Sequence, residues 1–376
     1  DSELNEIQRE IQEIDWEVSE AEKSGYDHFM YKEILEQSEV IERTLSGRLE
    51  ASSDEIPIKL DEASKFEKIW IVACGTAYHA GLFGKDLFEK VLGVPVSVEL
   101  ASEFRYREPI VGKNDLGIVI SQSGETMDTI AATELLKENG SHVLALVNVV
   151  GSSLARMADS VFYLHVGPEI GVASTKAYLG MLVSQLVLAK HWDAENKLDV
   201  SFDEIAELPK LIDKTMACEG QIKEISEKIY KKNDIYFIGR GLDYALAAEG
   251  ALKLKEISYL HAEALAAGEL KHGTLALIEK RTPVIVTASQ NHLLDKTTSN
   301  VQEVIARGAY VIAIGDNESE KLENISNDYV TLPDSNEILT TVISIIPLQF
   351  IAYHVANKNG QSIDQPRNLA KSVTVE

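Results

Sequence analysis

The stretch "VISQSGETMDT" (residues 119–129) decides the fold. A β-branched apolar run ends in a turn rich in hydroxyl groups, and an amphipathic segment follows, which predicts a strand, a turn and a helix. In a parallel sheet such a turn lies beyond the carboxyl end of its strand, where the helix N-terminus faces a ligand. An N-cap would explain one serine, whereas an anion cradle explains all the hydroxyls. We therefore predict a cradle formed by Ser121, Gln122, Ser123 and Thr126.

Outward from this stretch, short apolar runs alternate with long amphipathic segments from residue 68 onward. Such an alternation is typical of βαβ units on a parallel sheet. Strands are expected at 69–73, 116–120, 143–147 and 161–164, and again at 235–239, 284–287, 310–314 and 329–332.

The second set of strands repeats the first at nearly constant spacing. "CGTAY" (74–78) aligns with "RGLDY" (240–244) at an offset of 166 residues, and "ISQS" (120–123) aligns with "VTAS" (286–289) at the same offset. This constancy indicates a duplication, and the predicted fold class is α/β with two tandem doubly wound parallel-sheet domains. The expected parts are an N-terminal helical segment (1–56), a first domain (57–200), a second domain (201–362) and a C-terminal tail (363–376).

Length, charge and cysteine content exclude several classes of function. The 376 residues require more than one core, and the net charge of −24 argues against nucleic acid or an anionic membrane as a partner. The apolar run "VISIIPLQFIAYHVA" (342–356) is expected to be too short and interrupted to span a bilayer. No secretion signal is visible, and Cys74 and Cys218 lack metal-ligand spacing. We expect a cytoplasmic protein without a metal or cofactor.

The segment "LDYALAAEGALKLKEISYL" (242–260) predicts a helix with one charged stripe. Glu249, Lys253 and Glu256 are spaced i, i+4 and i+7, so they share a face. Such a stripe is commonly a solvated ladder of ion pairs. The neighbouring alanines and leucines favour an enclosed helix instead, in which a carboxylate beside a lysine would transfer protons. The residues alone leave both interpretations open.

Two other turns carry candidate ligand-binding groups. Thr76 lies in "CGTAYHAG" (74–81), and Ser174 lies in "EIGVASTKA" (169–177). Each turn fits a ligand loop or a helix cap equally well.

Histidines and the chain end are similarly ambiguous. His261 and His272 could be bases or packed side chains, and their spacing argues against a metal site. The ending "DQPRNLAKSVTVE" (364–376) contains Arg367 and Lys371 and is, on its own, typical of a solvated tail.

Taken together, "SQSGET", "EIGVASTKA", "GALKLKEISYLHAEALAAGELKHG" and "DQPRNLAKSVTVE" resemble the isomerase half of the glutamine–fructose-6-phosphate aminotransferases, also called glucosamine-6-phosphate synthases. The first motif alone indicates only a sugar isomerase (SIS) domain. The resemblance covers essentially the whole chain, including "KSGYDHFMYKEILEQ" (23–37). It implies conversion of fructose 6-phosphate and ammonia to glucosamine 6-phosphate, the first step of UDP-N-acetylglucosamine synthesis. It also implies a homodimer and a glutaminase domain on the same parent chain.

The resemblance further implies how the substrate is held. The phosphate would be bound by Ser121, Gln122, Ser123 and Thr126, and the sugar pocket would be lined by Thr76, Val172 and Ser174. One departure is Ala77, which stands where many relatives carry a serine and leaves one hydrogen bond to the sugar open.

The catalytic roles implied by the resemblance fall on the charged helix, one histidine and the tail. Glu256 would move a proton between C1 and C2, with Lys253 beside it contacting the sugar. His272 would open the sugar ring in the neighbouring subunit's site, a task suited to a group with a near-neutral pKa. Lys371 would form an imine with the open-chain ketose, and Arg367 would help to seat the tail.

For Lys371 to reach the sugar, the tail must fold back over the site. We expect it to be anchored by Arg367 and by burial of Leu369 and Val373. Residue 1 is Asp, and neither cysteine lies in a glutaminase context, so the chain is expected to be the synthase portion of a larger enzyme.

Two rival functions use the same fold. One is a deglycase or a glucosamine-6-phosphate deaminase/isomerase, which would share the phosphate cradle but not the full lysine-bearing ending. The other is a non-catalytic phosphosugar sensor, which needs neither Glu256 nor Lys371.

Overall fold

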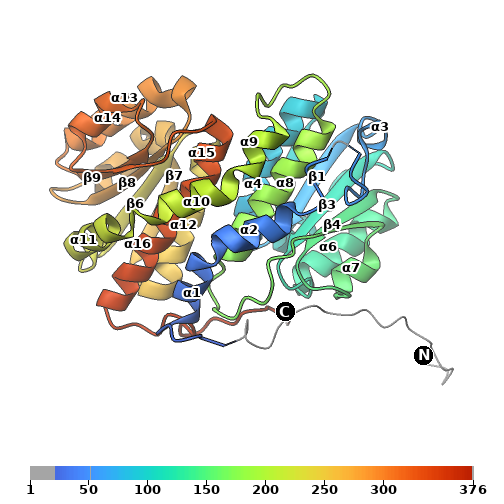
Figure 1. Cartoon of the computed structure of the whole chain (residues 1–376), viewed down its shortest axis with the longest axis horizontal. Coiled ribbons are helices and arrows are strands. Elements are labelled where there is room, and N and C mark those ends of the chain that lie inside the picture. Colours follow the sequence, from blue (N-terminus) through green and yellow to red (C-terminus); the bar gives the residue numbers. More distant parts are fainter. Residues whose placement is uncertain (1–21, 51, 375–376) are drawn as a thin grey trace.

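The computed structural model describes residues 22–50 and 52–374 (Figure 1). The stretch "ELNEIQREIQEI", predicted to be helical, lies outside these residues. The rest of the predicted N-terminal helical segment contains α1 (Phe29–Leu35) and α2 (Gln37–Leu45).

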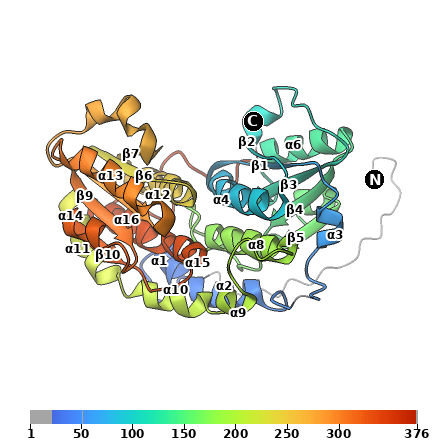
Figure 2. The ribbon, with the colours of Figure 1, turned by 90° about the horizontal axis from the view of Figure 1, so that it is seen from above.

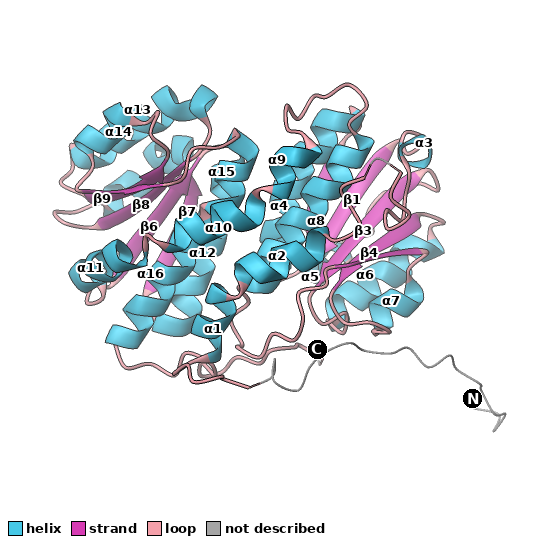
Figure 3. Ribbon diagram, viewed as in Figure 1, coloured by secondary structure: helices cyan, strands magenta, loops and turns pink. Residues whose placement is uncertain are grey.

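Two five-stranded parallel sheets form the centre of the two halves, as Figure 3 shows. The first has the order β2-β1-β3-β4-β5, with β1 (Lys68–Ala73), β2 (Val96–Leu100), β3 (Asp115–Ser121), β4 (His142–Val147) and β5 (Ser160–Tyr163). The second has the order β10-β9-β8-β6-β7, with β6 (Asp234–Gly239), β7 (His261–Ala266), β8 (Pro283–Ala288), β9 (Tyr310–Gly315) and β10 (Asp328–Thr331). Read from its other edge, the second order repeats the first, which confirms the predicted tandem α/β fold.

Every strand expected from the sequence is present, but β2 and β7 were not predicted. Both are edge strands, and only one residue of each is fully buried. Edge strands lack the continuous apolar run that burial on both faces requires. The offset of 166 residues, which carries 96–100 to 262–266, is the signal that could have found the pair.

Helices cover both faces of the first sheet. α4 (Gly75–Leu92) and α8 (Lys176–Trp192) pack on one face, and α5 (Ala101–Phe104), α6 (Met127–Glu138) and α7 (Ser153–Met157) pack on the other. Alternate residues of β1 enter different cores: Ile69 and Ile71 enter one, and Trp70 and Val72 enter the other. A short helix, α3 (Leu60–Ala63), precedes β1.

The second sheet is covered in the same way. Its inner face packs against α11 (Glu219–Ile229), α12 (Leu242–Ser258), α15 (Glu337–Ile343) and α16 (Ile345–Lys358). Its outer face packs against α13 (Leu294–Ile305), α14 (Glu320–Ile325) and the 3₁₀ helix η2 (Ala267–His272), followed along the chain by η3 (Thr274–Leu277) and η4 (Asn291–Leu293).

The two halves share one hydrophobic core, because α4 of the first packs directly against α12 of the second. The N-terminal helices join them further: α1 contacts α16, and α2 contacts both α8 and α10 (Leu208–Met216). Figure 2 shows α2, α10 and α9 (Phe202–Ala206) along one side of the molecule. The duplicated halves therefore meet along a packed helix–helix junction.

One apolar helical stretch is longer than the sequence pattern indicates. Glu337–Lys358, which comprises α15 and α16, is long and apolar enough to cross a membrane by length and composition. The prediction that this run is too short was wrong, because the helical turns before residue 342 lengthen it. Its apolar window is entirely buried against the rest of the protein, as in the core helix of a globular domain.

Candidate active site

A cavity of about 320 Å³ opens beyond the carboxyl ends of the first sheet. Its walls come from the N-terminus of α4, the turn after β3, the loop before α8, one face of α12 and the tail. The residues involved include Gly75, Thr76, Ala77, Ser121, Gln122, Ser123, Thr126, Val172, Ser174, Lys253, Glu256 and residues 369–373. All predicted site residues except His272 and Arg367 line this cavity.

The turn after β3 presents its hydroxyl groups to the cavity. Gly124 adopts a φ of +66°, and a Cβ there would lie 2.1 Å from Ser152 Oγ, so only glycine fits. Ser121 Oγ accepts a hydrogen bond from the Gly124 N–H at 3.0 Å and lies 3.2 Å from Thr126 Oγ1. Thr126 is the N-cap of α6 but makes no side-chain cap hydrogen bond. Capping therefore does not use its hydroxyl, which lies against Ser121 instead.

The charged stripe of α12 is enclosed, and the solvated-ladder alternative is wrong. Lys253 Nζ lies 2.7 Å from Glu256 Oε2 and 3.3 Å from Glu249 Oε1. The side chains of Lys253 and Glu249 are each 1% exposed, whereas Glu256 is 21% exposed at the cavity wall. Burial by itself lowers the pKa of Lys253, but the charges of the two glutamates outweigh burial and raise that pKa above its ordinary value. Lys253 thus stays an ammonium ion.

Thr76 and His79 connect this stripe to α4. Thr76 Oγ1 donates to Glu249 Oε1 at 2.9 Å and accepts from Lys253 Nζ at 2.9 Å. His79 Nδ1 lies 2.8 Å from the other oxygen of Glu249. The network therefore fixes the lysine of one half of the molecule against a hydroxyl of the other.

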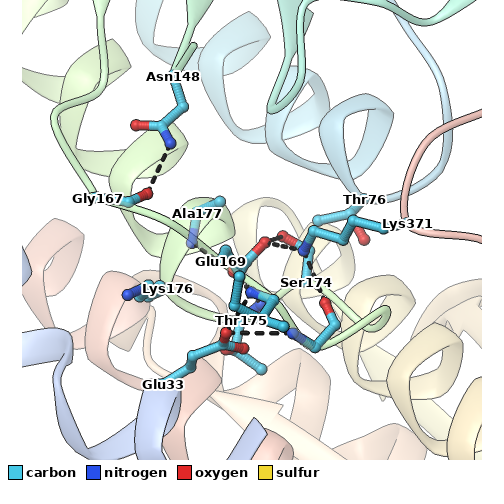
Figure 4. Close-up of polar contacts among 12 residues, drawn as sticks. Glu33, Thr76, Asn148, Gly167, Glu169, Ser174, Thr175, Lys176, Ala177 and Lys371 are labelled. Atoms are coloured by element: carbon cyan, nitrogen blue, oxygen red, sulfur yellow. Dashed lines mark hydrogen bonds and ion pairs between the residues drawn. The ribbon is translucent and has the colours of Figure 1, made fainter. Parts of the chain in front are cut away.

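The tail folds over the cavity, so the interpretation as a solvated tail is wrong. Lys371 Nζ donates to Glu169 Oε2 at 2.5 Å and to Gly171 O at 2.8 Å, as Figure 4 shows for the Glu169 contact. Two neighbouring contacts hold the tail to the cradle: Ser372 Oγ to Ser123 Oγ at 3.2 Å, and the Met127 N–H to Val373 O at 3.3 Å.

The anchoring of the tail differs from the prediction. Leu369 is 47% exposed and Val373 is 54% exposed, so their predicted burial is wrong. Polar and backbone contacts hold this segment instead. Arg367 lies outside the cavity. Its guanidinium lies 4.2 Å from the Tyr259 ring centroid, and its backbone N–H donates to Tyr259 Oη at 2.9 Å.

His272 does not reach this cavity within one chain. It is the last residue of η2, and its side chain is exposed. Its predicted role in a neighbouring subunit's site stays a prediction.

Glu169 is a site residue that the sequence analysis missed. Its Oε1 accepts from the N–H groups of Thr175 and Ala177 at 2.9 and 3.0 Å, and its Oε2 accepts from Ser174 Oγ at 2.9 Å. Burial would raise the pKa of this carboxyl, but the charge and hydrogen bond of Lys371 outweigh burial and lower it. The available signal was an acidic residue at the start of the quoted stretch "EIGVASTKA", a serine- and threonine-rich turn before a helix.

Within residues 22–50 and 52–374, no group of three or more His, Cys, Asp or Glu side chains could hold a metal ion. Cys74 and Cys218 are both free, and burial raises the pKa of each thiol, that of Cys218 to about 12.

Comparison with known proteins defines the family. A model of the SIS domain matches residues 63–190 and again residues 228–357. The chain belongs to the SIS domain family. The two matched ranges are the two halves that carry the parallel sheets, so each half is one SIS domain.

Individual proteins of the family show which members this chain is similar to. The chain is 48% identical to a glutamine–fructose-6-phosphate aminotransferase (isomerizing) from Clostridium tetani, over all of this chain and 64% of that protein. A solved structure of the C-terminal domain of glucosamine-fructose-6-phosphate aminotransferase from Francisella tularensis is 40% identical, with a TM-score of 0.86 over 92% of this chain and 100% of that one. A glucosamine-6-phosphate deaminase from Thermotoga maritima, 23% identical with a TM-score of 0.72 over 92% of this chain and 99% of that one, shares the fold.

These similarities identify the two SIS domains as the kind found in the isomerase part of such aminotransferases. The chain spans about 64% of the length of the Clostridium relative.

Proposed function

We propose that this chain converts fructose 6-phosphate and ammonia to glucosamine 6-phosphate. The observation that carries the proposal is the position of Lys371: the tail brings its amine to a cavity that also contains a hydroxyl-rich cradle and a carboxylate, Glu256. The cradle suits a phosphate group, the amine suits a carbonyl carbon, and the carboxylate suits a proton that moves between two carbons.

In this proposal the cradle binds the phosphate. In the cavity wall, the turn of Ser121, Gln122, Ser123 and Thr126 leads into the N-terminus of α6, whose dipole favours a dianion. This local arrangement compensates for an overall net charge of −24, which by itself repels phosphate. Thr76, Val172 and Ser174 then line the space for the sugar.

Lys371 is the nucleophile of the proposed imine. An amine must lose its proton before it can attack a carbonyl. Lys253, the other lysine at the cavity, is held as an ammonium ion between Glu249 and Glu256. Lys253 is thus suited to contact the sugar or to steady Glu256, and Lys371 is left to form the bond to C2.

Glu256 is the proposed proton carrier. Imine formation acidifies the C1 protons, and a carboxylate at the cavity wall can take one of them and return it to C2. The ammonium of Lys253 at 2.7 Å holds the carboxylate in place.

Further parts of the enzyme are needed for the whole reaction. We propose that a glutaminase domain on the parent chain supplies ammonia, and that a homodimer brings His272 of one subunit to the other's cavity to open the sugar ring. The two free cysteines fit a reducing, cytoplasmic location.

Covalent trapping tests the proposal. Borohydride added with fructose 6-phosphate should reduce an imine on Lys371, detectable as a mass increase on the C-terminal peptide. Lys371→Arg should prevent trapping, because the guanidinium stays protonated and cannot form an imine. Arg367→Lys, which adds an amine outside the cavity, is the matched control. In this variant the adduct should form on Lys371 and not on the lysine introduced at position 367.

An adduct on Lys253 would contradict the assignment of the nucleophile. Binding of fructose 6-phosphate without any adduct or turnover would instead identify a phosphosugar sensor.

A further inference from the structure

A buried carboxylate from the N-terminal segment lies beside the lysine site and has no part in the chemistry described so far. Glu33, on α1, is 2% exposed. Its Oε1 accepts hydrogen bonds from the N–H groups of Ile170 and Gly171, at 2.5 and 3.2 Å. These are the two residues directly after Glu169, and Figure 4 shows Glu33 reaching this loop from the opposite side to Lys371. Its Oε2 is buried without a hydrogen-bond partner.

The contacts form one connected unit. Glu33 holds the peptide N–H of Gly171, and the carbonyl of the same residue accepts from Lys371 Nζ at 2.8 Å. Lys371 gives another N–H to Glu169. Gly171 thus links Glu33 to the amine that Glu169 contacts directly, and both carboxylates are buried.

We propose that Glu33 is a positioning residue for the imine-forming lysine: its negative charge strengthens Glu169 as the acceptor of the Lys371 proton, and its hydrogen bonds fix the carbonyl that orients the amine. This inference rests on the proposed function of Lys371.

The proton balance follows from the contacts. The ammonium of Lys371 gives its proton to Glu169 Oε2, and the freed electron pair on Nζ adds to C2 of the ketose. The C2 oxygen takes a second proton from the nitrogen to give a carbinolamine. Glu169 then returns its proton to this hydroxyl, which leaves as water as the protonated imine forms. Glu169 ends ionised, and ammonium plus carbonyl have become iminium plus water.

The direction of the effect of Glu33 follows from its neighbours. The charged groups facing its carboxylate are Glu169 from the loop before α8, Lys371 from the tail and Lys176 from the start of α8. Burial and, next, the charge of Glu169 raise the pKa of Glu33 to about 7, and Lys371 opposes this less strongly than Glu169 promotes it. Because such coupling is reciprocal, ionised Glu33 favours the state with the proton on Glu169 over the state with it on Lys371.

The experiment compares trapping rates between pH 6 and pH 8.5. Wild type and Glu33→Gln are incubated with fructose 6-phosphate and cyanoborohydride, and the adduct on Lys371 is quantified by mass spectrometry. Taking the ratio of the two rates removes the pH dependence of the reductant and of ring opening. At pH 6 Glu33 is protonated and resembles glutamine, so the ratio should be near one. At pH 8 it is ionised, and wild type should be about tenfold faster, as a shift of one unit in proton affinity gives.

Controls separate this effect from damage to the fold. Glu39→Gln removes a carboxylate from the neighbouring helix α2, where the side chain is 72% exposed, and should match wild type at every pH. Affinity for glucose 6-phosphate should be unchanged in Glu33→Gln if the cradle is intact. Should Glu33→Gln fail to fold, Glu33→Asp carries the test. Aspartate keeps an ionisable group, but its shorter side chain weakens the contact with the loop. Its trapping rate at pH 8 should therefore lie below that of wild type and of Glu39→Gln.

The outcomes are distinct. A ratio of wild type to Glu33→Gln that is constant with pH, or a Glu33→Asp rate equal to wild type at every pH despite its shortened side chain, overturns the role of Glu33. Absence of any Lys371 adduct in wild type overturns the proposed function instead.

Discussion

The two SIS domains differ at corresponding strand ends. In the first, Ser123 follows β3 and lines the open cavity. In the second, Ser289 follows β8 at the same place in the repeat, but its Oγ donates to Asp243 Oδ1 at 2.6 Å and its N–H lies 3.1 Å from Asp243 Oδ2. Asp243 corresponds to Ala77 at the offset of 166 residues. Where the first domain has a methyl group, the second has a carboxylate that accepts the hydrogen bonds of Ser289, so these donors do not face a ligand.

The duplicated helices also diverge. α4 of the first domain contributes Thr76 to the cavity, whereas α12 of the second contributes Lys253 and Glu256 to the same cavity. The second domain therefore supplies reactive groups to its neighbour's site while its own strand end is satisfied by Asp243. The two duplicated corners therefore differ in that Asp243 fills the second from within.

The largest expected effect comes from giving the first domain the side chain of the second. Ala77→Asp should place a carboxylate next to Ser123, where it would take the donors and repel a phosphate. Two charges 4 Å apart near a protein surface interact by about 4 kcal/mol, so affinity for fructose 6-phosphate should fall at least about a thousandfold. Calorimetry measures this, with Ala77→Ser as the small, uncharged control. Unchanged affinity would show that the two positions are not equivalent.

A second prediction concerns the stability cost of the internal carboxylate. Burial raises the pKa of Asp243 from 3.8 to about 6 despite its hydrogen bonds from Ser289. The folded state therefore binds more protons than the unfolded state between these values, and wild type should lose stability as pH rises from about 4 to about 6. Relative to Asp243→Asn, which does not titrate, the loss should approach about 3 kcal/mol. Urea unfolding at several pH values measures the difference, and a difference independent of pH would contradict it.

The smallest effect sharpens the comparison between the two serines. Ser123→Ala should weaken binding of fructose 6-phosphate by about tenfold to a hundredfold, the usual worth of one hydrogen bond to a charged group. Ser289→Ala, its counterpart, should leave that affinity within about twofold because its hydroxyl is committed to Asp243. Unphosphorylated fructose should bind both variants equally. Equal losses of affinity for the two sugars would show that this turn does not bind the phosphate.

The repeat could be predicted from sequence because strands buried on both faces contain nearly continuous apolar runs. β3 and β8 show this pattern, with every residue buried. The pattern fails at β2 and β7, whose edge positions tolerate polar residues, and it fails for the tail, whose contacts are made largely by backbone and polar groups.

By itself, the sequence determined the duplicated fold, the hydroxyl-rich turn and the stripe of Glu249, Lys253 and Glu256. Each depends on spacing within one turn or one helix, where local geometry fixes which side chains share a face. Only the tertiary structure decided the meeting of Glu33, Glu169 and Lys371, whose hydrogen bonds join residues 137 and 202 positions apart. No periodicity encodes such contacts, because they depend on how α1, the loop before α8 and the tail pack against one another.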